Sequence, residues 1–142
     1  MKKAMLVAVV STALALNACA QKLKESEVPA AVKVSFTKQY PGITAKWEKE
    51  DGKYEAGFKK EGKNTSVLYE TNGTMTEIET DITVQELPAQ VVTYVKEHYS
   101  GQRIKEAAKI TKADGAINYE AEVNSKDLIF DESGKFLKEV KD

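Results

Sequence analysis

The chain has 142 residues, enough for one domain or two very small ones. Hydrophobic residues make up 42% of the sequence and charged residues 30%, which is typical of a folded globular protein and excludes general disorder. The formal charge of −1 gives no net attraction to nucleic acid, and one cysteine and one histidine leave little material for disulfides, metal sites or histidine catalysis.

The first twenty residues have the features of an export signal. Lys2 and Lys3 precede an apolar run over residues 4–16, and small residues follow at 18–20. A charged start, a short apolar core and a small-residue exit are typical of a secretory signal peptide, whereas a transmembrane anchor needs roughly 20 apolar residues. The sequence therefore predicts a signal peptide over residues 1–20 and a periplasmic or secreted mature chain.

Two processing routes fit this segment. Residues 18–20 follow the small-x-small rule, with cleavage before Gln21. Residues 16–19 also resemble a bacterial lipobox, in which Cys19 would be lipidated and would anchor the protein in the outer membrane, although Asn17 is unusual in that motif. Under either route Cys19 is not available for catalysis, and a membrane contact is expected only if Cys19 is lipidated.

Four sequence blocks recur in the same order along the rest of the chain. The paired blocks are residues 28–32 and 87–91, 38–42 and 97–101, 54–56 and 119–121, and 68–73 and 129–134. Because four ordered matches are not expected by chance, the sequence predicts a tandem repeat of one folding unit. The two copies span about residues 27–83 and 86–142 within a single domain over residues 21–142.

Each copy begins with apolar residues at every fourth position, the pattern of one face of an amphipathic helix. The two sets are Val28, Val32, Phe36 and Tyr40, and Leu87, Val91, Val95 and Tyr99. A proline close to the start of each set and a glycine after its end are residues that commonly bound helices. One helix per copy is therefore predicted.

After each helix the apolar period changes to two, which predicts strands. These lie at about residues 43–48, 53–59, 67–69 and 75–78 in the first copy, and 103–111, 116–123, 127–131 and 135–140 in the second. Asp51-Gly52 and Asn72-Gly73 are hairpin turn signals. The predicted fold class is α+β, with each helix followed by about four antiparallel strands. We expect both helices on one face of a shared sheet, whose other face stays open.

These motifs resemble the PepSY-like, β-lactamase-inhibitor-like domain family. The resemblance covers about residues 27–141 and rests on the Val28-Pro29-Ala30 and Leu87-Pro88-Ala89 starts, on Tyr40-Pro41-Gly42 and on the antiparallel meander. Ser100 replaces the proline in the second copy, which weakens the turn signature there. The resemblance implies a small exported bacterial protein that presents a sheet face, with inhibition as an analogy. It implies no catalytic or cofactor residues.

The charged residues of the predicted strands favour a solvated face over an active site. Carboxylates alternate with lysines at Glu48, Glu50, Asp51, Glu55, Glu70, Glu77, Glu79, Glu120 and Glu122. An acid–base pair would need two carboxylates with separated pKa values in a pocket. His98 is expected to lie on the surface or to cap a helix end. We therefore expect no enzyme activity, no cofactor and no metal site.

The candidate interaction surface comprises Lys53, Glu55, Tyr69, Glu120, Glu122 and Phe130. Tyr69 and Phe130 occupy matching repeat positions in runs that are apolar on both strand faces, so their side chains belong either to a recognition surface or to the core. Trp47 has the phase of a core residue.

Taken together, the sequence predicts an exported, non-enzymatic binding module that recognises an envelope protein or peptide through the open sheet face, with inhibition as one outcome. The alternative is a periplasmic sensor or carrier that holds a small molecule or lipid between sheet and helices, which would require an apolar cavity. No nucleic-acid partner is expected. The sequence does not fix the partner's identity or the oligomeric state.

Overall fold

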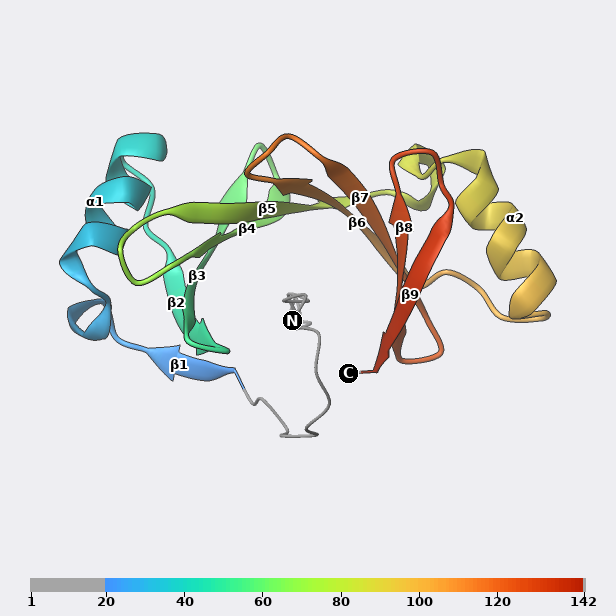
Figure 1. Cartoon of the computed structure of the whole chain (residues 1–142), viewed down its shortest axis with the longest axis horizontal. Coiled ribbons are helices and arrows are strands. Elements are labelled where there is room, and N and C mark those ends of the chain that lie inside the picture. The colour runs from blue at the N-terminus through green and yellow to red at the C-terminus, as the bar shows by residue number, and fades with distance from the viewer. Residues whose placement is uncertain (1–19, 142) are drawn as a thin grey trace. The chain divides into compact units, whose positions relative to one another are not determined.

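The computed structural model describes residues 20–141 (Figure 1). The described residues divide into two compact units, residues 20–78 and 79–141, named here the N-terminal unit and the C-terminal unit. Most of the predicted signal peptide, including Cys19, lies outside the described residues. Within residues 20–141, no helix combines the length and the apolar character needed to cross a membrane.

After the first strand, the chain twice follows the order of one 3-10 helix, one α-helix and four strands. The first seven are β1 (Gln21–Leu23), the 3-10 helix η1 (Glu25–Glu27), α1 (Ala30–Gln39), β2 (Lys46–Glu50), β3 (Lys53–Lys60), β4 (Lys63–Tyr69) and β5 (Met75–Ile82). The others are η2 (Val84–Glu86), α2 (Ala89–His98), β6 (Glu106–Lys112), β7 (Ile117–Val123), β8 (Lys126–Asp131) and β9 (Phe136–Lys141). Within each unit, antiparallel pairing joins strands that are neighbours in sequence, so the α+β class is confirmed.

The core of the N-terminal unit forms where α1 packs on the strands (Figure 1). All four residues of the predicted stripe, Val28, Val32, Phe36 and Tyr40, are buried. The Phe36 ring lies 5.4 Å from the rings of both Trp47 and Phe58, in edge-to-face geometry. Trp47 is therefore a core residue, as its phase predicted. Since aromatic edge-to-face contacts add to the burial of apolar area, this cluster fixes α1 on one strand face.

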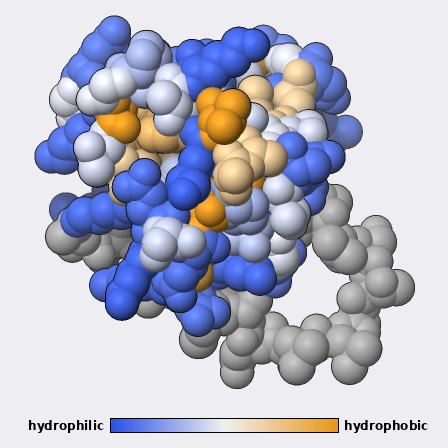
Figure 2. All heavy atoms as spheres, turned by 90° about the vertical axis from the view of Figure 1, so that its left-hand side faces the viewer, coloured by the Kyte–Doolittle hydropathy of each residue, from blue (hydrophilic) through white to orange (hydrophobic). Residues whose placement is uncertain are grey.

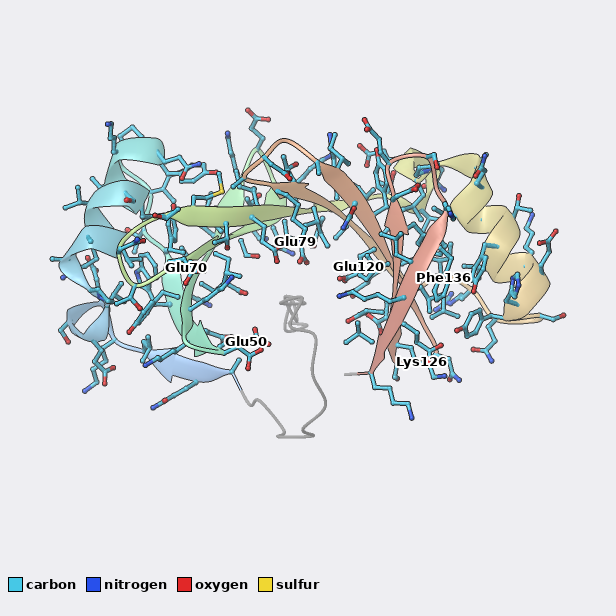
Figure 3. The ribbon with its side chains drawn as sticks, in the orientation of Figure 1. Glu50, Glu70, Glu79, Glu120, Lys126 and Phe136 are labelled. Atoms are coloured by element: carbon cyan, nitrogen blue, oxygen red, sulfur yellow. The ribbon has the colours of Figure 1, made fainter. Side chains whose placement is uncertain are left out.

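The C-terminal unit has its own core beneath α2, built from Val91 and Val95 on the helix and from alternate residues of β7 and β8. Tyr94 stacks on Phe136, with ring centroids 4.7 Å apart and planes at 9°, and meets Phe130 edge-on at 5.5 Å. Figure 3 shows Phe136 on the side of β9 that faces α2. Each helix thus covers one face of its own unit's strands.

The structure corrects the recognition-surface interpretation of Tyr69 and Phe130. Both side chains are 0% exposed and lie in the cores beneath α1 and α2. Their strand neighbours Leu68 and Ile129 point to the opposite face, because side chains alternate along a strand. The sequence left the choice open because both faces of each run are apolar, and the helix contact decides it. Tyr69 and Phe130 therefore cannot contact a partner directly.

The hydroxyl of Tyr69 donates a hydrogen bond to Oε1 of Gln39 at 2.9 Å, which ties β4 to the end of α1. We expect Tyr69→Phe to lower the free energy of unfolding by about 1 kcal/mol, the usual net value of one such hydrogen bond. Urea denaturation followed by circular dichroism measures this change. The cross-strand neighbour Tyr54 provides the matched control, and Tyr54→Phe should change the stability less. Equal effects of the two substitutions would show that the bond to Gln39 contributes nothing.

The sequence missed β1 and both 3-10 helices. β1 has three residues and pairs with β2, so it is too short to show an alternation. Each 3-10 helix begins where a glutamate accepts a hydrogen bond from a backbone N–H, at 2.7 Å from Lys24 N to Glu27 Oε2 and from Thr83 N to Glu86 Oε2. The second is a capping box of the form Thr-x-x-Glu, a signal that could have predicted it.

Two hairpin glycines pack directly against the helices. Gly73, between β4 and β5, has a φ of +87°, and an added Cβ would lie 2.5 Å from the carbonyl oxygen of Ala31 and 2.8 Å from Oγ of Ser35. Gly134, between β8 and β9, has a φ of +91°, and an added Cβ would lie 2.9 Å from Cβ of Gln90. The turn signal predicted the hairpin at Gly73 but not its contact with the first turn of α1.

Candidate functional site

The side of the N-terminal strands that faces away from α1 carries most of that unit's acidic residues. Because Trp47, Tyr54 and Ala56 point toward the helix, Glu48 and Glu55 point away from it. We call this side the N-terminal open face. It is formed by Lys46, Glu48, Glu50, Lys53, Glu55, Gly57, Ser66 and Leu68, and Figure 3 shows Glu50 at the end of β2, away from α1.

The strand register places Glu55 at the centre of this face. Glu55 on β3 pairs with Glu48 on β2 and with Leu68 on β4. Only 7% of Glu55 and 7% of Glu50 is exposed. The expectation that these carboxylates form a solvated face is therefore wrong for both residues. A residue on a central strand has neighbours on both sides, and at Glu55 these neighbours exclude water.

Burial and like charges together raise the pKa of Glu55 to about 8. Desolvation is the larger cause, because it penalises the charged form, and the nearby carboxylates of Glu50, Glu48 and Glu77 add to it. The pKa of Glu50 is raised to about 7, again first by burial and then by Asp51 and Glu48. A substantial part of this face therefore changes its charge near neutral pH.

Two buried polar atoms of the N-terminal open face have no hydrogen-bond partner among residues 20–141. They are Oε2 of Glu55 and Oγ of Ser66, and Ser66 is 6% exposed. Ser66 lies on β4 opposite Gly57. It is two residues from Leu68, which is opposite Glu55, so both β4 side chains are on the same face. Buried polar groups in folded proteins are nearly always hydrogen-bonded, so each exception requires an explanation.

One lysine of this face forms an ion pair with a residue outside the cluster. Nζ of Lys53 forms an ion pair with Oε1 of Glu70 at 3.1 Å. Lys53, predicted as part of the interaction surface, therefore lies at the border of the open face and does not neutralise Glu55.

A match to a family model identifies the family of this chain. A family model described as "Putative beta-lactamase-inhibitor-like, PepSY-like" matches residues 15–77 and 52–138, which together exceed half of the chain. The chain belongs to this PepSY-like family. The resemblance found in the helix-start motifs is thus confirmed. No curated protein matches the chain at a significant level.

Solved structures share the fold of this PepSY-like protein at low sequence identity. A "putative periplasmic" protein of Bacteroides eggerthii DSM 20697 is 20% identical with a TM-score of 0.71, covering 79% of this chain and 87% of that one. A DUF2874 family protein of Bacteroides uniformis ATCC 8492 is 22% identical with a TM-score of 0.69, covering 78% and 87%. A BLIP-like protein of Bacteroides fragilis NCTC 9343 is 24% identical with a TM-score of 0.63, covering 78% and 84%.

The C-terminal unit of the PepSY-like chain has a comparable open face, on the side of β6–β8 away from α2. Glu122 pairs with Glu106 and Asp127, and Glu120 pairs with Ala108 and with Ile129. Glu122 is buried and Glu120 is half-buried. The predicted residues Glu120 and Glu122 thus share one face, whereas Lys53 and Glu55 belong to the open face of the other unit.

The electrostatics of the N-terminal open face differ from those of an acid–base pair. The pKa values of Glu50 and Glu55 shift in the same direction, whereas a general acid and a general base need environments that push their pKa values apart. Among residues 20–141, no group of three or more His, Cys, Asp or Glu side chains could hold a metal ion. His98 is exposed at the end of α2 and stacks on Tyr94 at 4.0 Å.

Two surface hollows lie among the described residues, and the second includes Asn118 of the C-terminal open face. One is on the outer side of α1, lined by Lys33, Val34, Thr37 and Lys38, and the other lies beside the hairpins at residues 116–118 and 131–133. Figure 2, which looks onto the α1 side, shows separate apolar side chains within a mainly hydrophilic surface. Neither hollow lies between a helix and the strands.

Proposed function

We propose that this PepSY-like protein is an exported, non-enzymatic binding module that recognises a protein or peptide through the open strand faces of its units. The observation that carries this proposal is the pair of unpartnered, buried polar atoms on the N-terminal open face, Glu55 Oε2 and Ser66 Oγ. A face that only met solvent would leave its carboxylates hydrated. Buried acceptors without donors are instead expected at a surface that a partner completes.

The inhibitor-like description of the family and the BLIP-like protein of B. fragilis support recognition of a protein partner, with inhibition as its consequence. Export is supported by the signal-like residues 1–20 and by the B. eggerthii relative, which is described as periplasmic. We further propose that the two units arose by duplication, since η1–α1 and η2–α2 are each followed by four strands. The sensor alternative has no observation in its favour, because neither described hollow lies between helix and strands.

Site-directed photocrosslinking in the cells that produce the protein tests the proposal. A benzophenone amino acid at Lys46 or at Asn118, on the open faces of the two units, should form an adduct of discrete mass with one envelope protein. The same probe at Lys38, on the exposed side of α1, should form no such adduct. Adducts from Lys38 alone, or none from either open face, would overturn the proposal.

A further inference from the structure

Glu55 is a buried carboxyl group whose environment is incomplete. Among residues 20–141 its Oε2 has no hydrogen-bond donor, its side chain is more than nine-tenths buried, and three more glutamates lie close enough to affect its ionisation. Removing an ionised carboxylate from water is costly unless it is paired with a cation and hydrogen-bonded. Lys53 is bound to Glu70, and the causes that shift the pKa of Glu55 are burial and neighbouring carboxylates, with no cation among them.

The charges of the N-terminal open face indicate what would complete it. The groups that share this face with Glu55 or act on its charge are Lys22 on β1, Lys46, Glu48 and Glu50 on β2, Lys53 on β3, Glu70 after β4, and Glu77 on β5. Lys59 lies two residues beyond Gly57 on the same side of β3, so with Glu55 there are five acidic and four basic groups, and the face is negative when all carboxylates are ionised. A partner must therefore bring positive charge, together with N–H donors that can reach buried acceptors.

An arginine side chain fits these requirements. Its guanidinium remains charged at every relevant pH and presents five N–H donors in a planar fork that matches carboxylate geometry. The acceptors lie on adjacent strands of this face. Glu48 on β2 pairs with Glu55 on β3, and Ser66 on β4 pairs with Gly57 on β3. Gly57 has no side chain to cover the approach to Ser66, and among the described residues an added Cβ there would meet the carbonyl oxygen of Lys46 at 3.8 Å and nothing else within 4 Å.

We propose that the N-terminal open face binds an arginine side chain of a peptide partner, with Glu55 as the central carboxylate that accepts its hydrogen bonds. This inference rests on the proposed function and names the chemistry of its partner. The ion pair with the guanidinium offsets the free-energy cost of burying the ionised carboxylate of Glu55. Because the pKa of Glu55 is raised to about 8, its carboxyl group must ionise before it can pair with the guanidinium. The affinity for arginine should therefore increase as the pH rises toward 8.

Nuclear magnetic resonance titration of the 15N-labelled protein tests the inference, with acetyl-Gly-Arg-Gly-amide as the probe. At pH 8.5 we expect saturable amide shifts in β2, β3 and β4. The neutral peptide acetyl-Gly-citrulline-Gly-amide has nearly the same shape and should bind at least tenfold more weakly. The arginine peptide should lose up to about tenfold in affinity for each pH unit below 8.

Variants separate Glu55 from the overall charge of the protein. Glu55→Gln should weaken arginine-peptide binding at least tenfold, while its amide spectrum confirms the fold. Glu61→Gln makes the same chemical change at the exposed β3–β4 turn of the same unit and should leave binding unchanged.

Equal binding of the arginine and citrulline peptides, equal effects of the two variants, or shifts confined to the C-terminal unit would overturn the inference. If photocrosslinks from Lys46 or Asn118 persist in that case, the binding-module proposal stands without the arginine. If those crosslinks are absent, both proposals fail.

Discussion

Replacement of Gly73 by alanine is expected to destabilise the protein by about 3 kcal/mol. Alanine at a φ of +87° costs roughly 1 kcal/mol of backbone strain, and the added methyl group overpacks the contact with α1 by a further 1–3 kcal/mol. The new Cβ would lie 2.5 Å from the carbonyl oxygen of Ala31, so the hairpin or the helix must move. Urea denaturation monitored by circular dichroism and by Trp47 fluorescence measures the loss.

Gly62 provides the matched control for this substitution. It has a φ of +78° in the β3–β4 turn, but nothing lies within 4 Å of an added Cβ. Gly62→Ala should therefore show only the backbone strain, about 1 kcal/mol. The difference between the two variants isolates the contact between hairpin and helix. If Gly73→Ala is no more damaging than Gly62→Ala, the hairpin does not pack on α1 as the structure describes.

The second large effect concerns pH. The pKa of Glu55 is about 8 in the folded protein and about 4.5 when the chain is unfolded, so the folded state holds a proton that the unfolded state releases. Stability from this group is full below pH 4.5, falls as the pH rises, and is lost by about pH 8. Glu50, with a pKa of about 7, contributes in the same direction. We expect the free energy of unfolding to fall by on the order of 3 kcal/mol between pH 5 and pH 9.

Glu55→Gln should remove most of this pH dependence, because a neutral amide has no proton to lose. At pH 9 the variant should be more stable than the parent by about 2 kcal/mol, whereas at pH 5 the two should be similar. Urea denaturation at a series of pH values measures both curves. A parent stability that is constant from pH 5 to pH 9, or a variant curve that is parallel to it, would contradict the burial of Glu55.

The same substitution should therefore raise stability at alkaline pH and weaken arginine binding at least tenfold. A gain in stability together with a loss of binding is expected when a residue serves recognition and does not stabilise the fold. A purely structural carboxylate would behave differently, since its loss would lower stability at every pH at which it is ionised and paired. Measurement of both properties on one variant thus separates the two roles.

Much of the fold followed from local sequence patterns. The four-residue spacing from Val28 to Tyr40 predicted α1, because one side of a helix must be apolar to pack on a sheet. Alternation predicted β3 within one residue at its C-terminal end. β5 continues to Ile82, four residues beyond its expected end, because its second half is polar at most positions and gives little periodic signal.

The candidate site was predicted only in part. Glu55 could be assigned to the face opposite Tyr54 and Ala56, since alternation is a local property of a strand. Its burial could not, because that depends on the residues that β2 and β4 place beside it across the sheet. For the same reason, Tyr69 and Phe130 were assigned to the core only by their contacts with the helices.

By itself, the sequence determined the helix and strand order, the hairpin turns and the family, all of which depend on residues close together along the chain. Only the tertiary structure decided which apolar face each helix covers and which carboxylates lose their water. It also decided that a hairpin glycine touches a helix about forty residues earlier in the chain. Those properties depend on distances between segments far apart in sequence, which local patterns do not encode.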